Sequence, residues 1–263
     1  MEPYLRIQDV SKTFQTGGAS YAALAGVSLD IAWGEFVSLI GHSGCGKSTL
    51  LNLIAGLTRP TAGALTLAGE PIARPGPDRG LVFQHHALLP WLTVYGNVYE
   101  AVDAVFPRRA KAEKAGQVEE VLRLVGLWDH RHKRPAEISG GMKQRTAVAR
   151  AFAVHPRVLL LDEPFGALDA LTKSSLHDEL LALWTSDSKS ETVVLVTHDI
   201  DEAIFLSDRI VVMTNGPRAR IGEVVPVDLP RPRDKRALIH HPEYAAIKDR
   251  LLYLLTQAFA HAA

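Results

Sequence analysis

The sequence predicts an α/β fold with a largely parallel central sheet, and three observations lead to this prediction. Short apolar runs alternate along the chain with segments of helical spacing, as strands and helices do in α/β proteins. Two of these runs, within 157–164 and 192–199, are continuously apolar until they end in polar residues, as strands buried on both faces are. Near the N-terminus, 4–10 and 27–31 instead alternate between apolar and polar residues, which indicates half-buried strands.

The first third of the chain is expected to continue this mixture of strands and helices. An apolar run leads into a glycine-rich loop, and a segment of helical spacing follows the loop. A Pro at position 60 marks the point before which that helix must stop. The expected elements are strands at 36–40, 64–69 and 80–84 and a helix at 48–57.

The rest of the chain divides into three parts by its pattern of apolar and polar residues. From 86 to 156 strand signals vanish and helical spacing dominates, so this stretch is interpreted as a helical insertion into the α/β core. Two strand-like runs around an Asn-Gly pair predict a terminal hairpin in 209–227, and the polar, Pro-rich stretch after it marks a linker. The expected elements are helices at 111–127, 146–154, 174–186 and 242–260 and strands at 157–164 and 192–199. The expected division is a core of 1–85 and 157–229, an insertion of 86–156 and a helical tail of 230–263.

Composition and charge narrow the class of protein. In 263 residues, 47% are hydrophobic and 22% charged, which is typical of a globular protein. Lys plus Arg and Asp plus Glu both number 29, so the chain lacks the overall positive charge of a nucleic-acid binder, and we expect no nucleic-acid partner. The single cysteine, the absence of a signal peptide and the absence of a long apolar run predict a soluble, cytoplasmic chain whose work at a membrane goes through a partner.

The loop 41–49, "GHSGCGKST", has the composition and spacing of a phosphate-binding loop between a strand and a helix. Its glycines let the backbone wrap closely around phosphates, so that consecutive amides form an anion nest. Lys47 adds a positive charge for the β- and γ-phosphates, and the Ser48 hydroxyl is suited to a bound Mg²⁺.

Polar residues stand at the ends of three of the expected strands, where a parallel sheet gathers its ligand-binding groups. Asp162 ends one buried strand and is suited to hold the water shell of the metal, while Glu163 is suited to polarise a water aimed at the γ-phosphate. Gln84 ends a second strand and is expected to complete the Mg²⁺ shell or to position that water. His198 ends the apolar run of a third strand and is expected to donate to the γ-phosphate.

A second segment suited to bind an anion lies at 138–145, "ISGGMKQR". Ser139 and two glycines precede a helical segment, so bare amides, a hydroxyl and the positive end of a helix dipole come together. One small protein therefore carries two sites suited to phosphate.

Taken in order, "GHSGCGKST", "VFQ", "ISGGMKQR", "LLLDEPFGALD" and "VTHD" resemble the motifs of ATP-binding cassette (ABC) proteins over nearly the whole chain. The resemblance implies a P-loop NTPase fold of the RecA-like type, with a mainly parallel core, an N-terminal antiparallel β part, an inserted helical subdomain and a C-terminal helix. It also explains the two sites, because the signature motif of one ABC subunit binds the γ-phosphate of the ATP held by the other. Two chains then dimerise around two ATP, with Mg²⁺ as the metal.

Site residues follow from the same resemblance. Ile138 and Met142 depart from the commonest signature, but neither alters the Ser-Gly-Gly that touches phosphate. Phe14 fits the aromatic residue that stacks on adenine, and Tyr21 is its rival because the intervening "QTGGASY" makes the alignment uncertain. The signature residues are Ser139, Gly140, Gly141 and Met142, and Asp169 is the residue of the loop that crosses the dimer. The residues expected to bind ATP in the same chain are Gly41, His42, Ser43, Gly44, Cys45, Gly46, Lys47, Ser48 and Thr49, with Gln84, Glu163 and His198 as catalytic groups and Ser48, Gln84 and Asp162 near the metal.

The resemblance also implies the work that ATP hydrolysis drives. A single cassette with a short insertion favours an importer subunit over a soluble ABC ATPase acting on DNA or ribosomes. The segment 75–98 resembles the nitrate, sulfonate, taurine and bicarbonate subgroup of importers, and the chain looks closest to the short ATPase subunit of nitrate transporters. Bicarbonate, sulfonate or taurine, and cyanate remain alternative substrates. The implied partners are a second ATPase subunit, identical or not, transmembrane permease subunits and, indirectly, a periplasmic or lipid-anchored solute-binding protein. The implied location is peripheral, on the cytoplasmic face of the inner membrane.

Overall fold

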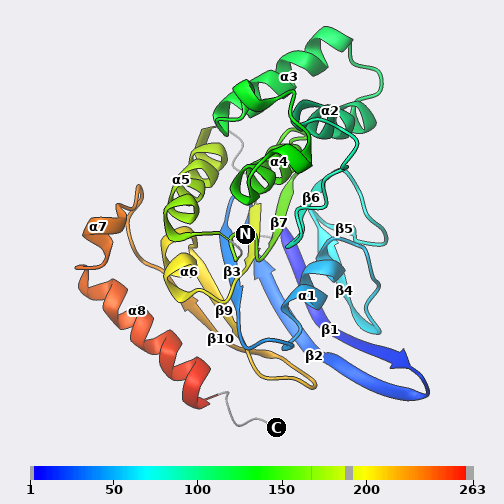
Figure 1. The fold of residues 1–263 in the computed structure, drawn as a ribbon. Helices are drawn as coiled ribbons and strands as arrows, with labels where there is room; N and C mark the ends of the chain where they lie inside the picture. The colour runs from blue at the N-terminus through cyan, green and yellow to red at the C-terminus, as the bar shows by residue number, and fades with distance from the viewer. Residues whose placement is uncertain (1–2, 167, 187–191, 259–263) are drawn as a thin grey trace. The chain divides into compact units, whose positions relative to one another are not determined.

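The computed structural model describes residues 3–166, 168–186 and 192–258, and Figure 1 labels their helices and strands. The chain divides into two units. The first unit combines Met1–Gly76 with Thr192–Ala263, and the second is Pro77–Glu191. None of the helices among the described residues combines the length and the apolar character that a membrane-spanning segment needs.

An antiparallel sheet begins the first unit and confirms the expected N-terminal β part. Its strand order is β2-β1-β4-β5. The alternation of the sequence explains its half-buried character, because Leu5, Ile7 and Val10 of β1 are buried while Gln8 and Asp9 are exposed. The four strands are β1 (Leu5–Thr16), β2 (Ala19–Ile31), β4 (Ala62–Leu67) and β5 (Glu70–Pro71).

A second set of strands in the first unit is mainly parallel. β3 (Phe36–Ile40) pairs in parallel with β8 (Thr192–Val196) on one side and with β9 (Arg209–Met213) on the other. Every residue of β3 and β8 is buried, which accounts for their nearly unbroken apolar runs. β10 (Ile221–Pro226) pairs antiparallel with β9, so the expected hairpin forms. The helices of this unit are α1 (Lys47–Ile54), α6 (Ile200–Leu206), α7 (Lys235–Leu238) and α8 (Pro242–Tyr253), and a π-helical turn at Leu254–Ala258 follows α8.

The second unit contains a parallel strand pair and most of the helical residues. β6 (Arg79–Val82) lies beside β7 (Val158–Asp162). Helix α4 packs on β6 and on α2, and α2 packs on α3. The helices are α2 (Val94–Val105), α3 (Lys111–Leu124), α4 (Gly140–Phe152) and α5 (Ala170–Ser186), with 3₁₀ turns at Trp128–His130 and Pro135–Glu137.

The structure corrects several details of the sequence-based expectations. The strands expected at 80–84 and 192–199 end earlier, at Val82 and Val196, so Gln84 and His198 follow the strands instead of ending them. The helix expected from 146 begins at Gly140, directly behind the serine of the signature motif. Helices α2 and α6 were not anticipated, and the last two residues of the helix expected at 242–260 lie outside the described residues.

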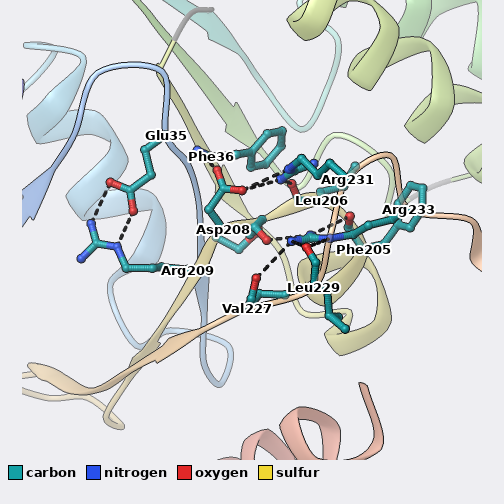
Figure 2. A network of polar contacts seen from close by, with 12 residues as sticks. Glu35, Phe36, Phe205, Leu206, Asp208, Arg209, Val227, Leu229, Arg231 and Arg233 are labelled. Atoms are coloured by element: carbon teal, nitrogen blue, oxygen red, sulfur yellow. Dashed lines mark hydrogen bonds and ion pairs between the residues drawn. The ribbon is translucent and has the colours of Figure 1, made fainter. Parts of the chain in front are cut away.

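Arginine side chains of the Pro-rich linker after β10 bind backbone groups elsewhere in the first unit (Figure 2). Arg233 is 9% exposed, and its Nη1 donates to the carbonyl oxygens of Ile204 at 2.8 Å, Phe205 at 3.0 Å and Ser207 at 2.7 Å. Its Nη2 donates to the carbonyl oxygens of Val227 and Leu229. Burial lowers the pKa of the guanidinium to about 10. The planar fork thus satisfies backbone acceptors of two segments at once.

We expect Arg233→Met to lower the free energy of unfolding by about 2 to 3 kcal/mol, because it leaves buried carbonyl groups without a donor. Arg236→Met is the matched control, since Arg236 lies three residues away on the same segment and is exposed. Urea denaturation of both variants checks the expectation. Equal stability of the two variants would contradict it.

Candidate functional site

The phosphate loop connects β3 to α1 through backbone angles that only glycine adopts easily. Gly41 has φ 155°, Gly44 has φ 79° and Gly46 has φ 90°. A Cβ atom on Gly46 would stand 2.7 Å from Cδ2 of Leu24, and one on Gly41 would stand 2.8 Å from Sγ of Cys45. The backbone conformation therefore favours glycine at both positions, and an added side chain would have to displace Leu24 or Cys45. Helix α1 begins at Lys47, within the loop 41–49.

Lys47 folds back beneath this loop. Its side chain is buried, and Nζ donates to the carbonyl oxygens of Gly41 at 2.7 Å and His42 at 3.0 Å. The ammonium group also lies 3.8 Å from Sγ of Cys45. Burial raises the pKa of the Cys45 thiol, and the charge of Lys47 partly opposes that rise. Ser48 and Thr49 follow in the first turn of α1, and Ser48 is exposed.

An open cavity of about 440 Å³ adjoins the loop. Tyr21 of β2 and the Asn215–Pro217 turn form its wall opposite the loop residues His42, Ser43 and Gly44. Phe14 of β1 stands directly opposite Tyr21 in the antiparallel register, so both rings project from the same face of the hairpin. Phe14 is 39% exposed and Tyr21 47%. The two rivals for the adenine-stacking role are therefore neighbours.

His198 also belongs to the first unit. It follows β8, whose parallel neighbour β3 leads into the phosphate loop, so both strands end at the same edge. The backbone around His198 is fixed, because the amide of Thr197 donates to Leu39 O at 3.2 Å and Asp199 caps α6 by accepting from the amide of Glu202 at 3.1 Å. The His198 side chain itself is exposed.

The second unit brings Gln84 and Glu163 together. Nε2 of Gln84 donates to Oε2 of Glu163 at 3.1 Å, across the end of the β6–β7 pair. Asp162 is the last residue of β7. Glu163 has φ 45°, in the left-handed region that non-glycine residues occupy rarely and that is common at functional sites. The carboxylate that sequence reasoning chose as catalytic thus lies on a strained backbone and accepts a hydrogen bond from Gln84.

The signature motif caps α4. Ser139 is the N-cap residue, and its Oγ accepts from the amide of Met142 at 3.3 Å. Gly141 is packed so closely on α5 that a Cβ there would stand 2.6 Å from Cγ2 of Thr172. Amides of the first turn of α4 and the Ser139 hydroxyl therefore gather at one helix end.

Asp169 caps the next helix. Its Oδ1 accepts from the amides of Leu171 at 3.2 Å and Thr172 at 3.0 Å, and the hydrogen bond to Thr172 lowers the pKa of the exposed carboxyl. The neighbouring residue 167 lies outside the described residues.

Two groups near these residues were missed by sequence reasoning. Arg150, two turns beyond the signature on α4, donates to the carbonyl oxygens of Ala87 at 2.7 Å and His86 at 3.2 Å, and so holds the segment that follows Gln84. Both carbonyl residues have positive φ, which no local pattern indicates. The Asn215–Pro217 turn was predicted as a hairpin turn, but its place in the cavity wall depends on strand pairing rather than on sequence.

Comparison with known proteins places the chain in a family. Residues 24–166 match the ABC transporter family. The bicarbonate transport ATP-binding protein CmpD of Synechococcus elongatus is 52% identical over 99% of this chain and 93% of its own length. The nitrate import ATP-binding protein NrtD of the same organism is 50% identical over 98% and 93%, and the nitrate transport protein NasD of Klebsiella oxytoca is 52% identical over 97% of both chains.

Solved structures agree with this placement. A dimeric structure of the ATP-binding cassette MJ0796 in a post-hydrolysis state, bound to ADP and Pi, is 33% identical and superposes with a TM-score of 0.75, covering 86% of this chain and all of that one. The fold is therefore that of an ABC ATPase cassette, with a P-loop NTPase core, an N-terminal antiparallel sheet and additional helices. The chain is thus a member of the ABC transporter family, in the group that contains the nitrate and bicarbonate transport ATP-binding proteins.

Proposed function

We propose that this chain, an ATPase subunit of an ABC importer, binds ATP and Mg²⁺ at the loop 41–49 and hydrolyses ATP against the signature motif of a second subunit. The observation that carries the proposal is the glycine-built loop between β3 and α1, with Lys47 folded beneath it. ATP binding requires Lys47 to exchange carbonyl partners for phosphate oxygens, which are stronger acceptors. The loop amides and the N-terminus of α1 supply the remaining positive potential.

The proposed hydrolytic group is the carboxylate of Glu163. It polarises the attacking water, and Gln84 keeps it in place through the 3.1 Å hydrogen bond. His198 is assigned to the γ-phosphate, where a donor stabilises charge that develops as the bond to the leaving group breaks.

Mg²⁺ suits the donors proposed for it. A hydroxyl from Ser48, an amide oxygen from Gln84 and a carboxylate from Asp162 are all hard oxygen donors, which this ion prefers. Gln84 directs its amide nitrogen to Glu163, so its oxygen is the atom suited to the cation. When bound, the ion neutralises phosphate charge.

The second subunit would complete each site. Ser139, Gly140 and Gly141, with Met142 behind them, offer their helix end to the γ-phosphate of the partner's ATP. Asp169 lies at the start of α5, and we assign it to the loop that crosses the dimer. Residues 1–85 and 157–229 are proposed as the ATP-binding core, 86–156 as the inserted subdomain and 230–263 as a tail.

Nitrate is the substrate that the sequence favours, and bicarbonate is named equally among the relatives. The subunit acts through permease subunits that span the membrane, with a solute-binding protein outside, so we place it peripherally on the cytoplasmic face of the inner membrane. Its own site touches ATP and never the transported anion, so the substrate is named by the partners. Ligand binding by the solute-binding protein that copurifies with the complex distinguishes nitrate from bicarbonate.

The composite ATP site is tested with Glu163→Gln, which keeps the side-chain shape but removes the carboxylate. Hydrolysis should fall at least 100-fold while ATP binding survives, because Lys47 and Ser48 remain. The trapped ATP should then hold two copies together, and size-exclusion chromatography with ATP and Mg²⁺ should show a dimer.

Adding Ser139→Arg to this variant should abolish the dimer, since the new side chain occupies the place of the γ-phosphate. The matched control adds Ala112→Arg, on an exposed position of α3, and should still dimerise. If Ser139→Arg dimerised as well as the control, the signature would not bind the partner's ATP.

The face that carries Phe14 and Tyr21 is expected to bind the nucleobase. Phe14→Ala and Tyr21→Ala should each raise the Kd for ATP by roughly five- to tenfold, as loss of base stacking does. Inorganic tripolyphosphate, which has no base, should bind all variants with unchanged affinity. Isothermal titration of both ligands checks this. Equal losses for ATP and tripolyphosphate would show that the changes act on the phosphate loop instead.

A permease-docking surface is expected around Trp91, whose side chain is 67% exposed. The buried side chain of Asn97 holds the backbone of Leu89 by accepting from its amide at 2.7 Å and donating to its carbonyl at 3.2 Å, which presents Trp91 outward. Trp91→Asp should reduce copurification with the permease more than tenfold without changing the melting temperature. Trp33→Asp, at a comparably exposed position on the other unit, should assemble normally. Normal assembly of Trp91→Asp would remove this surface from consideration.

A further inference from the structure

Helix α6 directly follows His198 and is too short to be stable alone. It spans Ile200–Leu206, and Asp199 is its N-cap residue. A helix of seven residues depends on tertiary contacts for its existence and its place. His198 is joined to it through that single capping residue, so whatever positions α6 also positions the backbone of His198.

The C-terminal end of α6 is held by the segment that follows β10 (Figure 2). Arg233 donates to the carbonyl oxygens of Ile204 and Phe205, and Arg231 donates to that of Leu206 at 2.5 Å. Arg231 also pairs with Asp208 at 2.9 Å. Two guanidinium groups thus satisfy the last carbonyls of the helix, where the negative end of its dipole lies.

The N-terminal end of α6 is held by α8. Oδ1 of Asp201, in the first turn of α6, accepts from the Tyr244 hydroxyl at 2.5 Å and pairs with Nζ of Lys248 at 2.6 Å. Tyr244 is buried, and burial, followed by the hydrogen bond to Asp201, raises the pKa of its hydroxyl, which therefore stays protonated and donates. A single carboxylate therefore joins the C-terminal helix to the helix behind His198.

The same C-terminal segment also reaches the phosphate loop. Nε2 of His42 lies 2.7 Å from the carbonyl oxygen of Leu255, just beyond α8, and so donates to it. Arg250 of α8 makes a two-pronged pair with Glu223 of β10, at 2.9 and 2.6 Å. Residues 231–258 thus contact both ends of α6, the loop 41–49 and the edge strand β10.

We propose that residues 231–258 act as a positioning element for ATP hydrolysis. Asp201 is the positioning residue through which their contacts with α6 fix the position of His198. The proposal rests on the role assigned above to His198. Asp201 itself touches no nucleotide in this account. Because Lys47 and the loop amides carry ATP binding, loosening α6 should disturb the transition state more than the bound ground state. The expected signature is a lower kcat with a nearly unchanged KM for ATP.

The test compares three variants of the full chain, assembled with its transporter partners. Asp201→Ala should lower kcat roughly three- to fivefold, the size expected for an exposed, solvent-screened contact, with KM within about twofold of wild type. Asp201→Asn keeps an oxygen acceptor for Tyr244 and Lys248 and should restore most of kcat. Arg6→Met is the matched control, since it removes an exposed ion pair of the same unit, with Asp30, that involves neither α6 nor residues 231–258.

A double-mutant cycle with His198→Ala separates positioning from general stability. In that background Asp201→Ala should cause no further loss of kcat, because the residue it positions is gone. A further three- to fivefold loss, or an equal loss in Arg6→Met, would overturn the positioning role while leaving the proposed function intact. Unchanged kcat in His198→Ala alone would instead overturn the role of His198 and this inference with it.

Discussion

Burial of β3 between two parallel neighbours constrains the chemistry of the first unit. Its side chains are apolar apart from Ser38, whose hydroxyl bonds that of Ser207, so polar groups that meet a nucleotide can appear only where the strand ends. The loop that leaves this strand turns at once through Gly41 and closes over the side chain of Lys47, the first residue of α1. A rigid, dry strand thus fixes the start of a loop whose amides must not move when phosphate binds.

In the second unit, hydrogen bonds from side chains fix the positions of the groups named above. Gln84 holds Glu163, Arg150 holds the carbonyls of His86 and Ala87, and Asn97 holds Leu89. These contacts run from the β6–β7 end to the loop that displays Trp91, and Arg150 belongs to the helix that Ser139 caps. Arg150 on the signature helix and Asn97 on α2 therefore both bind backbone groups of the segment that follows Gln84 and carries Trp91.

Much of this architecture follows from local sequence, and the remainder depends on distant partners. The apolar runs located β3, β7 and β8, with Asp162 at the end of β7, whereas β6 and β8 end two residues before Gln84 and His198. The burial of Arg233 could not be predicted, because it depends on carbonyl acceptors of α6, which lie far away in the sequence. Lys114 of α3 is likewise buried, with 4% of its side chain exposed, and pairs with Asp103 at 2.6 Å across the α2–α3 turn. Local patterns report periodicity, whereas charge burial is decided by tertiary pairing.

The single cysteine of the chain lies in the phosphate loop and is expected to react slowly with thiol reagents. Cys45 is 1% exposed, and its raised pKa keeps it as the unreactive thiol at neutral pH. Fluorescent or spin labels introduced at engineered surface cysteines would therefore report on their own positions, with no background from the native chain. Because Cys45 is buried, its rate of alkylation would report how often the loop opens. A slower rate with nucleotide bound would measure how firmly phosphate keeps the loop closed.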